Sequence, residues 1–332
     1  DMPTLWRHCL AGTGEINLSA VPILSQHQYL WSPGRFTAKL TGLLASTALT
    51  SKVSALPKDQ RPAVFRDPAF RGEIFALDEM VVDVPALVRA LAAPHQDVIY
   101  QIEPFSADDL TLDANGRLDS VTLKMADKVL TVSAQEFVFA AGAGNEVVSQ
   151  KLKHPEVAMQ RRPLHMVMAK TSFAHPVYAH CLGFGARPRL TITTHYLPNG
   201  EGVWYLGGQL SEDGVNRDSA AQIKAAKAEL ESLFPWLDFG KTEFATFRVD
   251  RAEPRQKNGL KPESAYVKQI ENMTVAWPTK LALAPRLAAD VLQRLTSSQL
   301  TMQAADTRTL QGWPIPELAT PVWEDAFCKK DV

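Results

Sequence analysis

Apolar side chains that recur every three or four residues mark the helices expected in this chain. That spacing brings side chains to one face of an α-helix. Asp83 is a suitable N-cap for one of these helices, and Pro85 suits its first turn. Ser219 is the expected cap of another. The pattern predicts helices at Met2–Leu10, Phe36–Leu49, Ala86–Ala93, Ser219–Leu233 and Leu281–Leu295.

Shorter apolar runs bounded by turn residues predict β-strands between these helices. The segment Leu197–Gly200 has the Pro-Asn-Gly composition of a tight hairpin turn. The predicted strands are Val21–Trp31, Gly72–Ala76, Val98–Ile102, Leu118–Lys124, Val129–Val132, Phe137–Ala141, Leu164–Thr171, Val177–Leu182, Arg189–Tyr196, Gly202–Gln209, Phe244–Val249, Tyr266–Ile270 and Thr274–Trp277. A large antiparallel sheet in mid-chain, flanked by pieces of an α/β unit, predicts that the chain passes between two domains more than once.

The composition is that of an ordinary globular protein. Of 332 residues, 45% are hydrophobic and 21% are charged. The net charge of −1 gives no basic field to attract nucleic acid. No apolar run approaches the roughly 20 residues of a membrane-spanning helix, and no charged start followed by an apolar stretch marks a secretory signal. We therefore expect neither a nucleic-acid partner nor a membrane span.

The cysteines give no sign of a disulfide framework. Cys9, Cys181 and Cys328 are widely spaced and form no Cys-x-x-Cys pair. This usage predicts a protein of the reducing cytoplasm. His180 lies beside Cys181, but the spacing of these residues matches no zinc site, so no metal is predicted.

A strand that ends in small residues is the first element able to carry chemistry. Phe137–Phe139 are bulky and apolar, which suits a strand covered on both faces, and residues 140–144 read Ala-Ala-Gly-Ala-Gly. In open α/β sheets, ligands lie outside the carboxyl ends of the strands, and small residues let the backbone approach them closely. The segment predicts either a ligand site or a strand that ends in a tight turn without a ligand.

A polar pair before the clearest helix is the second such element. Thr279 and Lys280 follow Trp277 and Pro278 and precede the helix Leu281–Leu295. The start of a helix has unpaired N–H groups and a partial positive charge, to which a lysine adds a full charge. The pair therefore suits a negatively charged group. The alternative is a capped amphipathic helix with an exposed lysine.

An arginine cluster is the third element able to carry chemistry. Arg248 and Arg251 lie three residues apart, so on a strand they face opposite ways. A guanidinium suits a carboxylate, which it can bind through two parallel hydrogen bonds. Surface ion pairs with Asp250 or Glu253 are the alternative for any one of these arginines, including Arg255.

Taken in order, these elements resemble the D-amino-acid-oxidase-like, or glycerol-3-phosphate-dehydrogenase-like, flavoprotein family. The order is a helix after Asp83, a β-meander, the Ala-Ala-Gly turn, a β-rich insert, the arginine cluster and the Thr-Lys helix. The resemblance covers most of residues 70–150 and 160–297. It implies an α+β or α/β fold with a truncated, Rossmann-like FAD-binding domain and a mixed, largely antiparallel β-sheet substrate domain. The implied domains are discontinuous: 1–16, 81–160 and 256–332 for FAD, and 17–80 and 161–255 for the sheet.

The resemblance also implies roles for individual residues. The Ala-Ala-Gly turn would lie beside the ribityl-pyrophosphate of FAD, and the Thr-Lys pair near the N1–O2 edge of the flavin, where negative charge gathers on reduction. The implied cofactor-binding residues are Val98, Ala141, Gly142, Thr279 and Lys280. The implied substrate-binding residues are Arg251, with Arg248 and Arg255 as rivals, and Tyr205 and Tyr196, with His195 beside them. No catalytic base is implied.

The sequence departs from the family in three places. Trp277 and Pro278 stand where relatives usually carry glycine, and Arg251–Arg255 stands where they often show Gly-x-Arg-Pro. No Gly-x-Gly-x-x-Gly turn occurs in the chain, which begins at Asp1 within an expected helix. We therefore expect a flavoprotein chain without its first βαβ unit, which by itself binds FAD poorly or not at all.

The function implied is that of an FAD-dependent oxidoreductase, of the amine or 2-hydroxy-acid oxidase or dehydrogenase type, with a small-molecule substrate. Two alternatives stay open. One is a non-catalytic binding or interaction module that keeps the fold, and the other is the flavin subunit of a multi-component dehydrogenase or an RNA-modifying oxidase. The sequence has no stripe of Lys and Arg to support an RNA partner.

Overall fold

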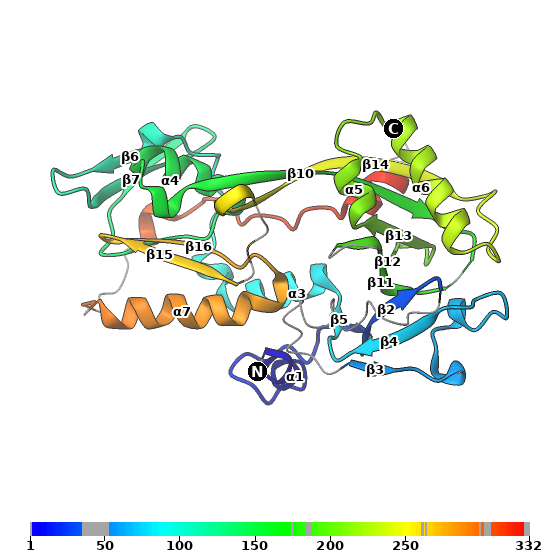
Figure 1. Ribbon diagram of the computed structural model, residues 1–332. Helices are drawn as coiled ribbons and strands as arrows, with labels where there is room; N and C mark the ends of the chain where they lie inside the picture. Colours follow the sequence, from blue (N-terminus) through cyan, green and yellow to red (C-terminus); the bar gives the residue numbers. More distant parts are fainter. Residues whose placement is uncertain are drawn as a thin grey trace.

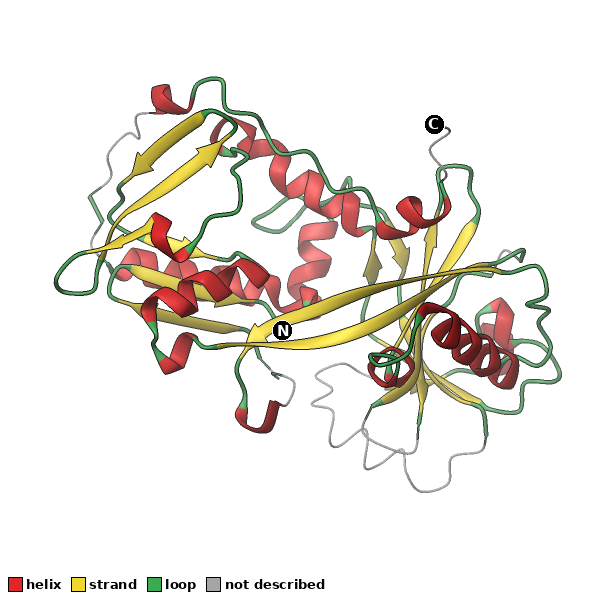
Figure 2. Cartoon of the chain, turned by 90° about the horizontal axis from the view of Figure 1, so that it is seen from above, coloured by secondary structure: helices red, strands yellow, loops and turns green. Residues whose placement is uncertain are grey.

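Two groups of elements make up the structure, and one pair of long strands joins them. The structure is a computed structural model that describes residues 2–34, 53–173, 175–183, 187–259, 262, 264–298, 300–301 and 307–328. Strands β10 (Met159–Lys170) and β14 (Glu243–Pro254) pair antiparallel along their whole length. Figure 1 shows this pair running from the group that holds α4 and α7 to the group that holds α5 and α6, and Figure 2 shows its curvature from above.

An eight-stranded sheet forms the larger group. Its strand order is β14-β10-β13-β12-β11-β2-β4-β3, and each neighbouring pair is antiparallel except β11 with β2. The predicted mixed, largely antiparallel sheet is therefore confirmed. Its further strands are β2 (Gln28–Ser32), β3 (Val53–Ala55), β4 (Glu73–Leu77), β11 (Tyr178–Leu182), β12 (Pro188–Tyr196) and β13 (Gly202–Gly207).

The two faces of this sheet are covered differently. Neighbouring residues on a strand point to opposite faces. Val167 and Trp204 therefore join a core that includes Leu230 of helix α6, whereas Met168 and Tyr205 contact the C-terminal helix α8 on the other face. The helices that cover the sheet are α5 (Gln209–Asp213), α6 (Ser219–Leu233) and α8 (Val322–Phe327). We call the face under α8 the inner face.

Three small sheets and the other helices complete the fold. The sheet orders are β15-β16-β9, β6-β7-β8 and β1-β5. Helix α7 lies along β15 and β16 (Figure 1). The strands are β1 (Ile23–Ser25), β5 (Val81–Val82), β6 (Leu110–Leu112), β7 (Leu118–Met125), β8 (Lys128–Val132), β9 (Phe137–Phe139), β15 (Tyr266–Ile270) and β16 (Met273–Trp277), and the helices are α1 (Met2–Leu10), α3 (Val84–Ala92), α4 (Asn145–Leu152) and α7 (Ala284–Ser297).

Short 3₁₀ helices connect many of these elements. They are η1 (Lys58–Gln60), η2 (Ala63–Phe65), η3 (Ala93–Val98), η4 (Ala107–Asp109), η5 (Gly142–Gly144), η6 (Pro155–Val157), η7 (Lys257–Gly259), η8 (Leu281–Leu283) and η9 (Thr307–Leu310). Among the described helices, none has both the length and the apolar character that a membrane crossing requires.

Several predicted elements need correction. Val98–Ile102 is not a strand, because Val98 ends η3 and the next residues pair with no strand of the described chain. Helix α6 is capped by Asp218 rather than Ser219: its carboxylate accepts a hydrogen bond from the Ala221 backbone N–H. Asp83 does cap α3, as predicted. The predicted helix Phe36–Leu49 lies outside the described residues.

Candidate functional site

The carboxyl ends of β9 and β16 meet at one edge of a sheet. The two strands are parallel, with Phe139 opposite Val275, so the turns that follow them emerge side by side. The Trp277 indole Nε1 donates a hydrogen bond of 3.3 Å to the Gly142 carbonyl. The structure thus brings together the Ala-Ala-Gly turn and the Thr-Lys turn, which lie more than a hundred residues apart in sequence.

Asn145 fastens the two turns to each other. Its side chain is fully buried, its Oδ1 accepts from the Ala141 N–H at 3.2 Å, and its Nδ2 donates to the Ala276 carbonyl at 3.1 Å. One amide therefore links the end of β9 to the end of β16, and it fixes the spacing of the two turns. Nothing in the sequence pattern had singled out this residue.

The Gly142 turn is open on its outer side. Gly142 has a φ of +55°, which favours glycine, and a Cβ built on it would meet no atom within 4 Å. A strand end without side-chain bulk and with free space above it is the shape that the backbone of a ligand-binding turn needs. The residues of this turn therefore fit a ligand that lies against the main chain.

Thr279 and Lys280 form a tight turn before η8 and α7. Thr279 has a φ of +62°, and its hydroxyl donates to the Ser264 carbonyl at 3.1 Å. Lys280 is exposed, and no side chain caps η8 or α7. The first N–H groups of this helical segment and the lysine charge thus favour an anionic group. Val98 is 58% exposed at the end of η3 and does not belong to this sheet.

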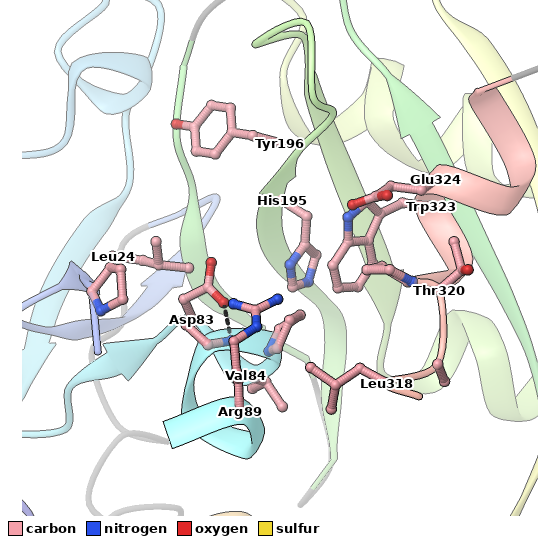
Figure 3. A pocket seen from close by; sticks show the side chains of 15 residues that line it. Leu24, Asp83, Val84, Arg89, His195, Tyr196, Leu318, Thr320, Trp323 and Glu324 are labelled. Atoms are coloured by element: carbon pink, nitrogen blue, oxygen red, sulfur yellow. Dashed lines mark hydrogen bonds between the residues drawn. The ribbon is translucent and has the colours of Figure 1, made fainter. Parts of the chain in front are cut away.

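A cavity of about 550 Å³ lies at the inner face of the large sheet. Its walls come from four places: β1 with the residue before it, the start of α3, the end of β12, and α8 with the tail that leads into it (Figure 3). Predicted residue Tyr196 lines it, together with its neighbour His195. The full lining is Pro22, Leu24, Asp83, Val84, Pro85, Ala86, Arg89, His195, Tyr196, Leu318, Ala319, Thr320, Pro321, Trp323 and Glu324.

His195 and Trp323 form an aromatic stack in this cavity. Their ring centroids are 3.7 Å apart and the rings are nearly parallel, at 11°. The Tyr205 ring meets His195 edge-on at 5.9 Å. Burial lowers the pKa of His195 to about 4, and the nearby Asp83 carboxylate offsets only part of this effect. The imidazole is therefore neutral at neutral pH.

This low pKa predicts a pH dependence of stability. The folded protein binds the His195 proton less readily than the unfolded chain, whose His pKa is 6.5. The stabilisation is fully present above pH 6.5 and is lost as the pH falls toward 4. We expect about 2 kcal/mol of acid destabilisation from this residue. Urea unfolding of the wild type and of His195→Gln at several pH values would measure this loss of stability. If the free energies of unfolding of the two proteins changed with pH in the same way, the low pKa of His195 would be refuted.

The arginine cluster lies outside the cavity, and both Arg248 and Arg251 bond to α5 or to the loop between α5 and α6. Arg248 donates to the carbonyls of Val215 and Arg217, at 2.6 and 2.5 Å. Arg251 Nη2 donates to Glu212 Oε1 at 2.9 Å, whereas its Nε is buried without a partner among the described residues. Neither arginine lines the cavity. Their roles in substrate binding stay predictions.

Tyr205 lies on the inner face, packed against Phe247 at 5.7 Å between ring centroids. Burial raises the pKa of its hydroxyl to about 12, so the group stays protonated. Arg255 donates its backbone N–H to the Ala158 carbonyl, and its side chain is exposed. Within the described residues, no cluster of His, Cys, Asp and Glu is arranged to hold a metal ion.

Residues that the sequence did not single out form much of the site. Trp323 and Glu324 lie in α8, at the end of a Pro-rich tail whose composition indicates only a covering segment. An aromatic residue beside an acidic one in such a tail was the available signal. Asn145 directly follows the glycine turn, and a polar side chain at that position was the corresponding signal there.

Comparison with known proteins gives one strong match and several weaker ones. The probable FAD-dependent oxidoreductase PA4991 of Pseudomonas aeruginosa is 44% identical over 333 residues, which cover 98% of this chain and 81% of that protein. The crystal structure of PA4991 matches with a TM-score of 0.78, 42% identity, and coverage of 98% of this chain and 82% of that one. No protein-family model matches the chain.

Two more distant structures share the fold. L-proline dehydrogenase from P. horikoshii has a TM-score of 0.60 at 8% identity, covering 90% of this chain and 78% of its own. Glycine oxidase from Bacillus cereus has a TM-score of 0.55 at 13% identity, covering 85% and 76%. At these identities the likeness shows the fold alone. The predicted fold class, a mixed α/β architecture of this flavoprotein type, is confirmed.

Proposed function

This chain belongs to the family of FAD-dependent oxidoreductases, and we propose that it oxidises a carbon that carries an amine or a hydroxyl group. The observation that carries the proposal is the edge where β9 and β16 end. There an open glycine turn lies beside the Thr279–Lys280 turn that precedes η8, and one buried asparagine links the ends of the two strands. FAD, when bound, supplies the hydride acceptor.

The residues of this edge have distinct parts in holding FAD. Ala141 and Gly142 offer main chain without bulk, which suits the ribityl-pyrophosphate portion. Thr279 and Lys280 precede η8, whose start no side chain caps, and the Lys280 charge there favours negative charge on the ring system. Val98, exposed on η3, is the proposed adenine contact.

The substrate would bind on the inner face of the eight-stranded sheet. Tyr196 and His195 line the cavity there, and Tyr205 packs behind His195. We propose Arg251, with Arg248 as its rival, as the partner of a substrate carboxylate that lies outside the cavity, because neither arginine lines it. We assign residues 1–16, 81–160 and 256–332 to the cofactor domain, and 17–80 and 161–255 to the substrate domain.

The chain has no Gly-x-Gly-x-x-Gly turn for the pyrophosphate. We therefore propose that residues 1–332 alone bind FAD weakly, and that tight binding needs a dinucleotide-binding turn that this sequence does not hold. The turns that follow β9 and β16 would supply the remaining contacts to FAD.

The visible absorption spectrum of the protein expressed from its natural start codon tests the function. We expect a yellow protein, with residues 1–332 alone paler at the same FAD concentration. Gly142→Val should weaken FAD binding about tenfold or more, because its side chain fills the open space above the turn. If every form stays colourless with added FAD, the oxidoreductase proposal fails and a non-catalytic binding module replaces it.

Gly116→Val is the matched control for this variant. Gly116 also has a positive φ, of +82°, and a Cβ added to it would likewise meet no atom within 4 Å, but it lies in the turn before β7. Both variants thus place a valine at a positive φ, a strain of roughly 1–2 kcal/mol in each. Equal FAD affinity in the two variants would contradict the assignment of Gly142 to the cofactor.

A further inference from the structure

The inner-face cavity has the size and lining of a small-molecule site. Its volume of about 550 Å³ lies in the range of ligand pockets. Its wall combines apolar leucine, valine, alanine and proline side chains with a nearly equal share of polar groups. Figure 3 shows Asp83 and Arg89 from α3 and its cap, His195 from β12, and Trp323 and Glu324 from α8 around the cavity.

The charges of the lining are unequal in number and in burial. Two carboxylates, Asp83 and Glu324, face one guanidinium, Arg89, which leaves a net charge of −1. Arg89 is exposed, so water and salt screen it, whereas both carboxylates are half-buried. His195 adds no charge near neutral pH. The less screened charge in the cavity is therefore negative.

Glu324 carries the less compensated of the two carboxylate charges. One oxygen of Asp83 accepts the Ala86 N–H at 2.8 Å, and the start of α3 offsets part of its charge. The Glu324 carboxylate has no hydrogen bond or ion pair to any residue of the described chain. A carboxylate can only accept hydrogen bonds, so its natural partner is a cationic donor.

Trp323 adds an aromatic surface next to this carboxylate. Its indole lies against His195 on one side and lines the cavity in the labelled view of Figure 3. Tryptophan is the aromatic side chain that attracts cations most strongly. Leu318 and Leu24 supply apolar contacts for the rest of a ligand.

We propose that this cavity binds an organic ammonium ion with an apolar body, its nitrogen at Glu324 and its body against Trp323 and the leucines. This proposal rests on the proposed function in one respect, because it takes the ammonium ion as the substrate. The charge of the cavity then discriminates between the two substrate classes: an amine enters as a cation, whereas a 2-hydroxy acid is an anion that Glu324 and Asp83 repel.

The test is calorimetric binding of three probes of one shape that differ in charge: 2-phenylethylamine, 2-phenylethanol and phenylacetate, at neutral pH and without turnover. We expect the amine to bind about tenfold tighter than the alcohol, and the acid to bind weakest. Glu324→Gln should remove about tenfold of the amine affinity and leave the alcohol unchanged. Glu317→Gln, an exposed residue of the same tail outside the cavity, is the matched control.

Three outcomes would overturn the proposal: tighter binding of the acid, no preference for the amine, or equal effects of the two glutamine variants. The flavin spectrum separates this failure from that of the proposed function. A yellow protein without amine preference loses only the cavity assignment. A colourless protein that prefers the amine keeps the cavity assignment as a cation-binding site and loses the oxidoreductase function.

Discussion

Replacing Asn145 with alanine is expected to lower the free energy of unfolding by about 3 kcal/mol. The side chain is fully buried, and its loss leaves the Ala141 N–H and the Ala276 carbonyl without these partners. A small cavity adds to the cost, because the interior cannot fully close around it. Urea denaturation followed by tryptophan fluorescence would measure the loss.

The same substitution should also weaken FAD binding, because the turns after β9 and β16 would no longer be held at one spacing. Trp277, which donates to the Gly142 carbonyl, is a natural reporter of that change. Asn115→Ala is the control: Asn115 is exposed in the turn before β7, so its replacement should change stability by less than about 0.5 kcal/mol. Equal stability of the two variants would exclude the fastening role of Asn145.

Replacing Glu253 with glutamine should lower the free energy of unfolding by about 3 kcal/mol. The change leaves the partly buried charge of Arg162 without its anionic partner. Arg162 donates to the Glu253 carboxylate through two hydrogen bonds, of 2.7 and 2.9 Å. The glutamate side chain is only 5% exposed and the arginine 20%. The pair lies on one face of β10 and β14, the strands that join the two groups of elements.

The pH dependence of this effect has a definite sign. Burial opposes ionisation of Glu253, but the hydrogen bonds from Arg162 outweigh it, and the pKa of the carboxyl falls below its usual value of 4.5. The stabilisation is therefore present above pH 4.5 and is lost as the pH falls through the lower, folded-state pKa. The difference between wild type and Glu253→Gln, measured by urea unfolding, should shrink under acid.

A surface pair provides the comparison. Glu231 lies 4.0 Å from Lys227 on α6, and both side chains are about half exposed. Glu231→Gln should cost less than about 0.5 kcal/mol, because water screens this pair. If Glu253→Gln is no more destabilising than Glu231→Gln, the ion pair of Glu253 with Arg162 stabilises the fold no more than a surface pair does.

Local spacing was enough to predict elements that are decided within one segment. The apolar period of Met2–Leu10, the Asp83 cap of α3 and the Pro-Asn-Gly turn before β13 all appear in the structure. Long-range pairing decided the exceptions. Strand β14 extends past Val249 to Pro254 because β10 pairs with it throughout, and Val98–Ile102 has no partner strand in the described chain.

The sequence by itself determined where the two turns lie and which family they resemble, since small residues after a strand and a polar pair before a helix are local signals. Only the tertiary structure decided how these turns meet, through the parallel register of β9 and β16 and the buried amide of Asn145. It alone also formed the cavity, whose lining comes from four distant segments. Contacts of this kind depend on chain topology, which no spacing within a segment can express.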